Sequence, residues 1–192
     1  SVFYELRDVA DPRAVDSLLR ILDDDTEPWG DRYSAALVFS ELYEPRALSP
    51  LIAIVDDTSQ HHYLREKAVK ALRRMGDIAA VPVLIKALGD DSYAVSREAF
   101  WALNNLSYYA MDELIDALEY TDHGQREKAA DILGNIRHPR AIKPLIDVMG
   151  DERLYVRRQI AFSLYQITLQ DLGNEQEPWL RWYEERFGNE GY

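Results

Sequence analysis

The sequence predicts an all-α protein: an α-solenoid of about five stacked helix pairs with a capping helix at its C-terminal end. Residues 45–57 (PRALSPLIAIVDD) recur almost unchanged 94 residues later, at residues 139–151 (PRAIKPLIDVMGD). Strand-like alternation of apolar and polar residues is absent, and internal repeats of this length are typical of helical arrays. Pairs of aliphatic residues recur every 30 to 33 residues, at Leu18-Leu19, Leu51-Ile52, Leu84-Ile85, Leu114-Ile115 and Leu145-Ile146.

Each repeat begins with a short helix that starts near a proline, as in PRAVDSLLRIL and PRAIKPLIDVM. Proline is tolerated there because the first N–H groups of a helix have no acceptor within the helix. An acidic turn then leads to the second helix. The turns contain Asp23-Asp24-Asp25, Asp56-Asp57, Asp90-Asp91, Asp122 and Asp151.

The second helix of each repeat is longer, as in YLREKAVKALRRMG. Apolar side chains recur there with the spacing of one helix face. The first position on this face is small, which lets neighbouring helices approach closely, and it holds Ala35, Ala68, Ala99, Ala129 and, in the last repeat, Ile160. Four residues later stand Phe39, Leu72, Leu103, Leu133 and Leu164. A single helix pair cannot cover such a face, whereas stacked pairs can.

The proline-start helix, the acidic turn and the VRR or LRE opening of the second helix resemble HEAT-like repeats. More narrowly, they resemble the short type named after phycobilisome lyases. The resemblance covers residues 1–168. It implies that second helices line a concave binding surface, and that the arginine opening each second helix pairs with a turn aspartate of the same or the adjacent repeat. These structural repeat arginines are Arg32, Arg65, Arg126 and Arg157, with Ser96 at this position in the third repeat.

We expect one domain over residues 1–192, with five repeats in residues 12–168. Residues 1–10 align with the tail of a second helix. Either they form a half-repeat, a short helix that caps the array, or the chain begins inside a longer array. The second alternative leaves an apolar edge suited to a homodimer or heterodimer. Residues 171–192 are predicted to form a C-terminal cap, whose helix carries Trp179, Trp182, Tyr183 and Phe187 on one face.

The composition excludes several classes of site. The net charge is −12, which disfavours binding to nucleic acid and to anionic membranes. The chain has no cysteine, so thiolate metal sites and cysteine nucleophiles are excluded. The four histidines, His61, His62, His123 and His138, fall in expected turns or at helix ends, and none is followed by glutamate. We therefore expect no metal, no cofactor, no catalytic residue and a cytoplasmic location.

The exposed side of the second helices is the expected binding surface. Trp101, Phe162 and Tyr165 stand where a solvated helix would carry Lys or Glu, and aromatic and Arg side chains are typical anchors of protein interfaces. Together with Arg73 and Arg97, they predict a partner-binding groove over repeats two to five. The alternative is that curvature buries these side chains against neighbouring helices.

The leading functional prediction is a non-catalytic scaffold that binds a protein or peptide partner on its concave helix surface. The alternative comes from the family resemblance alone, which implies a subunit of a bilin lyase or another chromophore-handling protein. Members of that kind attach or detach a linear tetrapyrrole, often as heterodimers of two repeat chains. The missing cysteine does not exclude this alternative, because the acceptor thiol would belong to the substrate protein.

Overall fold

The computed structural model describes residues 12–120 and 122–188, which contain helices and turns and no strand. The half-repeat or cap predicted for residues 1–10, and the dimer edge that depends on it, lie outside the described residues. The chain divides into two compact units, Ser1–Leu106 and Ser107–Tyr192, and each is described here by itself. The single domain over residues 1–192 stays a prediction.

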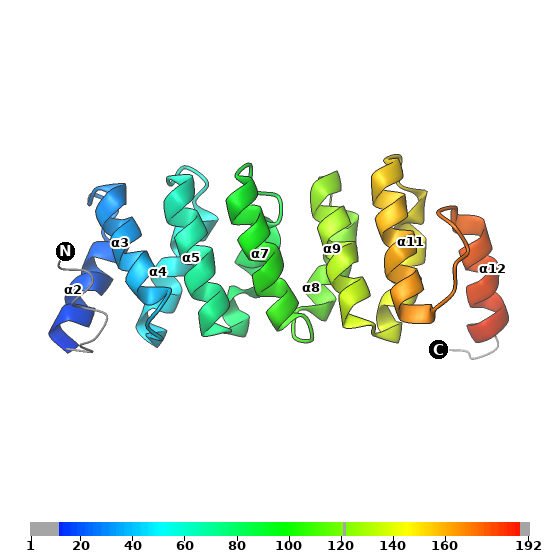
Figure 1. Ribbon diagram of the computed structural model, residues 1–192, viewed down its shortest axis with the longest axis horizontal. Coiled ribbons are helices and arrows are strands. Elements are labelled where there is room, and N and C mark those ends of the chain that lie inside the picture. Colours follow the sequence, from blue (N-terminus) through cyan, green and yellow to red (C-terminus); the bar gives the residue numbers. More distant parts are fainter. Residues whose placement is uncertain (1–11, 121, 189–192) are drawn as a thin grey trace. The chain divides into compact units, whose positions relative to one another are not determined.

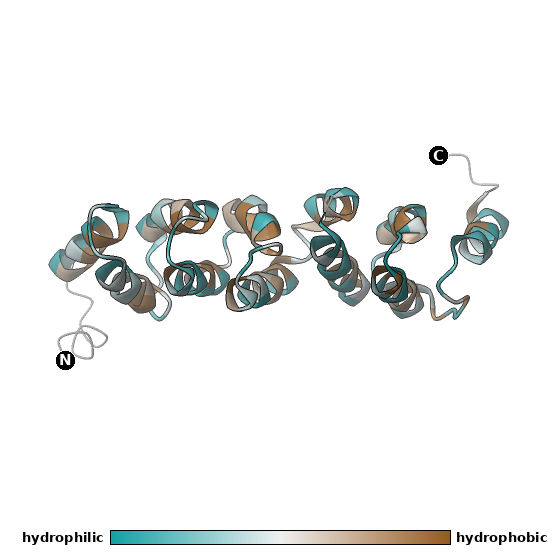
Figure 2. Cartoon of the chain, turned by 90° about the horizontal axis from the view of Figure 1, so that it is seen from above, coloured by the Kyte–Doolittle hydropathy of each residue, from teal (hydrophilic) through white to brown (hydrophobic). Residues whose placement is uncertain are grey.

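The N-terminal unit holds three helix pairs in two layers. Helices α3, α5 and α7 pack side by side in one layer, and α2, α4 and α6 form the other (Figures 1 and 2). The pairs are α2 (Pro12–Asp23) with α3 (Trp29–Phe39), α4 (Leu48–Asp56) with α5 (His62–Met75), and α6 (Val81–Ala87) with α7 (Tyr93–Leu106).

The C-terminal unit holds two further pairs and a last helix. Helix α9 packs along α11, and the shorter helices α8 and α10 lie against them. The elements are α8 (Met111–Asp116), η3 (Ala117–Glu119), α9 (His123–Ile136), η4 (Pro139–Ala141), α10 (Ile142–Asp147), η5 (Val148–Gly150), α11 (Leu154–Thr168) and α12 (Gln176–Phe187). The described residues thus confirm the α-solenoid class, with five helix pairs and a C-terminal helix.

The duplicated PRA motif forms a short 3-10 turn ahead of the first helix. The turns η1 (Pro45–Ala47) and η4 (Pro139–Ala141) precede α4 and α10, which begin at the next residue. Side chains before the prolines cap these turns: Glu44 accepts from the Arg46 backbone N–H, and His138 accepts from that of Arg140. Pro12 itself begins α2, as predicted. The third repeat has an equivalent turn without proline, η2 (Ile78–Ala80).

The predicted apolar face of the second helices is the core. The small residues Ala35, Ala68, Ala99 and Ala129 are fully buried, and so are the larger residues that follow them by one turn. Helices α9 and α11 approach closely at Gly134 of α9, where an added Cβ would lie 2.8 Å from the Cα of Ser163 on α11. The Ser163 hydroxyl donates to the carbonyl oxygen of Ala130 at 2.7 Å, which joins the same two helices.

Helix α12 packs on α10 at the end of the C-terminal unit. Trp179 is completely buried, and its indole N–H donates to the carbonyl oxygen of Gly173 at 2.9 Å. The Gln176 amide donates to the carbonyl oxygens of Ile146 and Asp147 at the end of α10, at 2.8 and 3.1 Å. This helix therefore supplies additional hydrogen-bond donors to the carbonyl groups at the end of α10. No helix in the described ranges, 12–120 and 122–188, is long and apolar enough to cross a bilayer.

Candidate functional site

Two of the four repeat arginines bind the turn aspartate of the next repeat. Arg65 on α5 donates from Nε and Nη2 to both carboxylate oxygens of Asp90, at 2.9 and 2.8 Å, and from Nη1 to the carbonyl oxygens of Thr58 and Gln60. The Arg65 and Asp90 side chains are only 7% and 3% exposed. Arg126 on α9 similarly donates from Nε to Asp151 at 2.7 Å. A buried, bidentate pair of this kind has its donors occupied, so its role is to join repeats.

The other two repeat arginines differ from the expected pairing. Arg32 donates to the carbonyl oxygen of Leu22 and to the side chain of Gln60, whose amide in turn donates to Asp57, so a glutamine connects Arg32 to the next turn. Arg157 donates to the backbone carbonyl of Asp151 and has no carboxylate partner among the described residues. Arg157 lies on α11, which is followed among the described elements by the single helix α12 rather than by a helix pair with an aspartate turn.

The turn aspartates have a second, local role. Asp24, Asp57, Asp90 and Asp151 each accept the backbone N–H of the residue two positions later. Burial alone would raise the pKa of Asp151, but the Arg153 N–H and the Arg126 guanidinium outweigh it and hold that pKa below its usual value. Stabilising the turn explains why aspartate recurs there, without any need for a ligand.

Trp101 and Arg97 are exposed together on α7 of the N-terminal unit. They are one turn apart, and Trp101 is 50% exposed. The guanidinium of Arg97 lies 5.7 Å from the ring centroid of Tyr93, and no carboxylate pairs with it in the described part of the chain. This helix therefore presents an aromatic ring and an unpaired cation to solvent.

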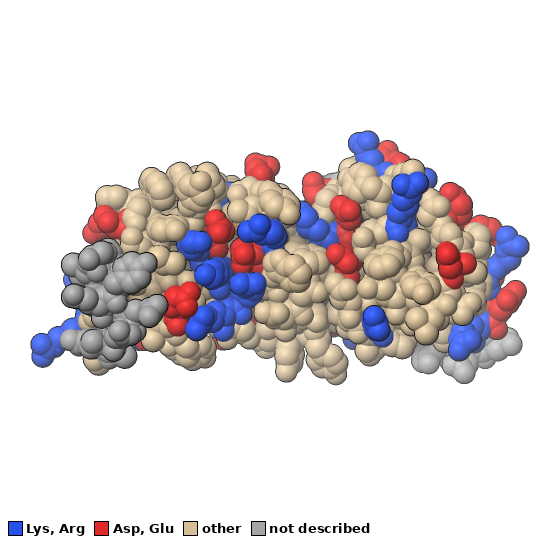
Figure 3. Space-filling model, viewed as in Figure 1, with Lys and Arg blue, Asp and Glu red and all other residues tan. Residues whose placement is uncertain are grey.

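Cations gather over the neighbouring helix α5, as Figure 3 shows on the face that Figure 1 presents. Arg73 Nη2 lies 3.4 Å from Glu98 Oε2 on α7, although that buried oxygen has no hydrogen-bond partner among the described residues. Lys70 and Arg74 share one carboxylate, that of Glu41, at 3.6 and 3.2 Å. In a protein of net charge −12, these three cations share two carboxylates, those of Glu41 and Glu98.

Phe162 and Tyr165 are exposed on α11 of the C-terminal unit, one turn apart. Two other large apolar side chains on the same side, Tyr155 and Leu169, are also exposed, although the sequence reading did not single them out. Tyr155 precedes Phe162 by seven residues and Leu169 follows Tyr165 by four, and this spacing along one helix face was the available signal. The five predicted anchors thus divide into Arg73, Arg97 and Trp101 in one unit and this aromatic pair in the other. The continuous groove over repeats two to five stays a prediction.

Half-buried charges lie on α9 of the C-terminal unit. Burial raises the pKa of Asp131 above its usual value. Burial also raises the pKa of Glu127, partly offset by Lys128, and lowers the pKa of Lys128 itself. Burial, which removes solvent from these groups, is the largest cause of all three shifts in pKa.

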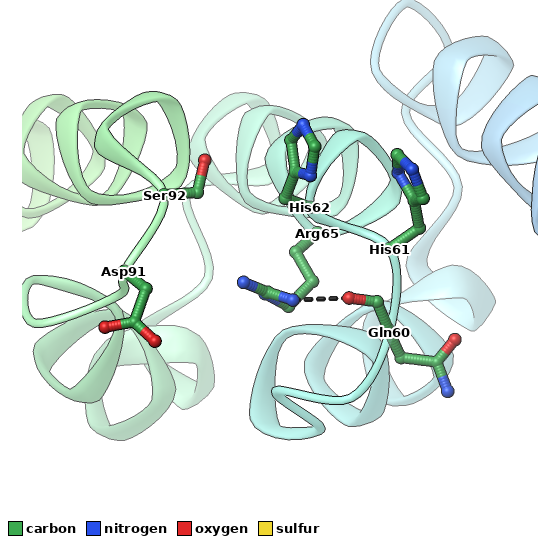
Figure 4. A pocket seen from close by; sticks show the side chains of 6 residues that line it. All are labelled: Gln60, His61, His62, Arg65, Asp91 and Ser92. Atoms are coloured by element: carbon green, nitrogen blue, oxygen red, sulfur yellow. Dashed lines mark hydrogen bonds between the residues drawn. The ribbon is translucent and has the colours of Figure 1, made fainter.

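A pocket of about 490 Å³ opens between the turns that precede α5 and α7. Figure 4 shows its lining residues: Arg65 is bonded to the main chain of Gln60, and the rings of His61 and His62 point away from Arg65. His61 stacks on Trp29 with ring centroids 3.9 Å apart. Because the Arg65 donors are already occupied, the pocket offers little to bind an anion. Across residues 12–120 and 122–188, no group of three His, Asp or Glu side chains is placed to hold a metal ion.

Comparison with known proteins shows a family match and a group of relatives. The family of HEAT repeats matches residues 58–124 and 111–177. A phycocyanobilin lyase subunit beta of Nostoc sp. is 29% identical over 125 residues, which cover 64% of this chain and 56% of the relative. The bilin biosynthesis protein RpcF of a Synechococcus species is 32% identical over 104 residues, covering 54% of this chain and 50% of the relative. The chain therefore spans about half the length of the curated relatives it matches.

Solved structures share the fold. A designed armadillo repeat protein in complex with the peptide (KR)4 has a TM-score of 0.53 at 21% identity, covering 81% of this chain and 82% of the other. The complex of CpcE and CpcF of phycocyanin lyase from Nostoc sp. has a TM-score of 0.50 at 24% identity, covering 85% of this chain and 67% of that chain. At such identities the likeness establishes the arrangement of helices and nothing finer.

Proposed function

The chain belongs to the HEAT-repeat family, and on that basis we propose that it is a subunit, or the repeat part of a subunit, of a chromophore-handling protein of the bilin-lyase type. The observation that carries the proposal is the match to curated relatives named for bilin attachment and bilin biosynthesis. These relatives favour the bilin-lyase alternative over the non-catalytic scaffold that the sequence suggested first.

The exposed groups of α5 and α7 suit a linear tetrapyrrole. Such a chromophore combines a long conjugated system with carboxylate side chains. Arginine binds carboxylates with two parallel hydrogen bonds, and an indole ring offers a flat apolar surface. Trp101, Arg97 and Arg73 present these two kinds of group on adjacent helices. We assign them the role of holding the chromophore.

A protein partner belongs to the same proposal. The chain has no cysteine, so the thiol that would receive or release a chromophore must come from another protein. The solved lyase from Nostoc sp. is itself a complex of two chains. We therefore propose that the exposed side of the second helices binds a protein partner, as in the scaffold interpretation, in addition to the chromophore.

The test is an absorbance titration with phycocyanobilin, the bilin after which the Nostoc relative is named. We expect the wild-type protein to shift and sharpen the long-wavelength band of the bilin, because a binding site restricts its conformations. Trp101→Ala and Arg97→Gln should each weaken the apparent affinity by about tenfold, the usual scale for an anchor residue. Tyr43→Ala is the matched control, since Tyr43 is an exposed aromatic residue outside this site.

Two results would count against the proposal. An unchanged bilin spectrum at saturating protein would remove the chromophore function. Equal affinity in wild type, Trp101→Ala and Arg97→Gln, with circular dichroism unchanged, would retain the function but move the chromophore away from α7.

A further inference from the structure

The outward face of α11 carries an apolar stripe in the C-terminal unit. Tyr155, Phe162 and Tyr165 lie along the helix, and Leu169 directly follows it. Their exposed fractions are 48, 53, 46 and 73% respectively. An exposed row of large apolar side chains on a stable helix is typical of a surface that another molecule covers.

The spacing of the stripe is that of a seam between two helices. With Arg158 included, the positions advance by three, four, three and four residues, as the core positions of a heptad repeat do. The buried side chains of α11, Val156, Ile160 and Leu164, lie on the opposite side of the helix. A narrow stripe with this spacing fits one packed helix, whereas a flat protein surface would need a broader face.

The second helices α5 and α9 carry a less apolar set of side chains at the positions of this stripe. The positions of α9 that correspond to Tyr155, Arg158, Phe162 and Tyr165 are Gly124, Glu127, Asp131 and Gly134. The corresponding positions of α5 are Tyr63, Glu66, Lys70 and Arg73. In α9 these positions are half-buried or buried, and Gly134 lies at the contact with Ser163 of α11. The stripe on α11 therefore corresponds to a side of α9 that another helix partly covers, and its side chains are more apolar than those of α5 and α9.

The positive charge of Arg158 indicates what kind of molecule would cover the stripe. Arg158 is exposed in the middle of the stripe, and it has no carboxylate partner among the described residues. An occupant that covers the stripe would bring an apolar face against the rings and would gain from a carboxylate opposite Arg158. Because α11 contains no Asp or Glu, a second copy of α11 would bring no carboxylate to Arg158.

We propose that α11 is the docking site for an amphipathic helix of a partner protein, which carries an apolar seam and an acidic residue opposite Arg158. Helix-in-groove recognition of this kind uses anchors at three- and four-residue spacing. The inference rests on the proposed function for the existence of a protein partner. Bilin binding is measured by a separate titration and at α7, so a failure of either one can be recognised.

The test uses two synthetic peptides of three heptads with Leu at both core positions. One peptide has Glu at the flanking positions and the other has Lys, and like charges there oppose self-pairing of each peptide. Binding is followed by fluorescence anisotropy of the labelled peptide added to the whole chain. We expect the wild type to prefer the Glu peptide, and Phe162→Asp to weaken binding by about tenfold or more.

Reversing the charge of residue 158 tests whether a charged residue of the partner helix lies opposite it. Arg158→Glu should weaken the Glu peptide and strengthen the Lys peptide. Tyr43→Ala, which removes an exposed aromatic ring elsewhere, should change neither affinity. Circular dichroism of each variant checks that the helices are retained; Phe162→Ala replaces Phe162→Asp if that variant fails to fold.

Three results would overturn the inference. The first is no binding of either peptide to wild type, and the second is equal binding to wild type and Phe162→Asp. The third is a wild-type dimer in light scattering that Phe162→Asp dissociates, because the occupant would then be a second copy of this chain.

Discussion

Two adjacent aspartates in the turn between α6 and α7 have very different surroundings. Asp90 is buried against Arg65 with two hydrogen bonds, whereas Asp91 is exposed at the edge of the pocket. The sequence presents them as one acidic pair. Removal of Asp90 leaves the buried guanidinium of Arg65 without its carboxylate partner, whereas removal of Asp91 leaves no buried charge unpaired.

Asp90→Ala should therefore lower the free energy of unfolding by about 3–5 kcal/mol, the cost of leaving one partner of a buried ion pair alone. Asp91→Ala is the matched control and should change it by less than about 0.5 kcal/mol. Urea unfolding followed by circular dichroism measures both. Similar losses in the two variants would show that the Arg65 pair does not join the repeats.

Substitution of Asp131 on α9 should raise the free energy of unfolding, whereas substitution of Asp90 should lower it. Burial raises its pKa, so ionisation costs more in the folded chain than in the unfolded chain. This penalty is complete above the folded pKa and disappears below the unfolded pKa. Asp131→Asn should thus raise the free energy of unfolding at pH 7 by about 0.5 kcal/mol, the scale of partly exposed sites. The gain should vanish as the pH falls towards 4 in a pH series of urea titrations; a gain that grows on acidification would contradict this account.

At the scale of elements, alanine substitutions at two glycines of α9 distinguish the effect of helix propensity from the effect of packing against α11. A Cβ at Gly134 would lie 2.8 Å from the backbone of Ser163, whereas a Cβ at Gly124 would meet only the Asp122 side chain at 3.3 Å and the end of Lys128. Alanine favours a helix over glycine by up to about 1 kcal/mol at either position. At Gly134, the contact with α11 decides whether alanine stabilises or destabilises the protein.

Gly134→Ala should destabilise the protein by about 1–3 kcal/mol through overpacking between α9 and α11. Gly124→Ala should be neutral or stabilising by up to about 1 kcal/mol. Thermal unfolding of the two variants tests this directly. If Gly134→Ala raises the melting temperature, the two helices are not in close contact at this residue.

Helix α12 is held by its single buried tryptophan. Trp179→Ala should cost about 3–5 kcal/mol and expose the amides of α10 and α12 to hydrogen exchange. Trp179→Phe keeps a buried ring and loses the hydrogen bond to Gly173, so it should cost about 1 kcal/mol beyond the change in volume. Unchanged exchange in α10 after Trp179→Ala would mean that α12 does not protect the last repeat.

The helix pairs could be predicted from sequence because packing dictates their pattern. The buried alanines and leucines of the second helices recur at fixed spacing, and the structure places them in the core. Two details could not be predicted. Pro45 and Pro139 open 3-10 turns capped by Glu44 and His138, whereas Pro12 of the same PRA motif begins α2 directly. Gln60 also replaces a direct link between Arg32 and an aspartate, since one repeat aligned with another does not reveal such a substitution.

The candidate site was predictable only in part, because binding residues are those the repeats do not share. Trp101, Phe162 and Tyr165 could be recognised as aromatic residues at solvated positions, and all three are exposed. The full stripe on α11 needed the exposures of Tyr155 and Leu169, which periodicity alone does not give. The cations over α5 likewise required distances, because the sequence does not show that Lys70 and Arg74 share one carboxylate.

At the scale of the whole molecule, an acidic repeat protein is proposed to hold an anionic chromophore. The net charge of −12 opposes this association at long range, so binding must depend on the local cations and rings of α5 and α7. Salt should therefore weaken the repulsion as well as the local attraction, and affinity should change only modestly with ionic strength.

The most direct test of the central claim is sedimentation velocity of a mixture of the protein and phycocyanobilin, recorded at the absorption band of the bilin. We expect bilin to sediment with the wild-type protein, and we expect Trp101→Ala to lower the fraction of bilin that does so while Tyr43→Ala leaves that fraction unchanged. Bilin that remains at the rate of the free pigment, in the presence of excess folded protein, would contradict the chromophore function.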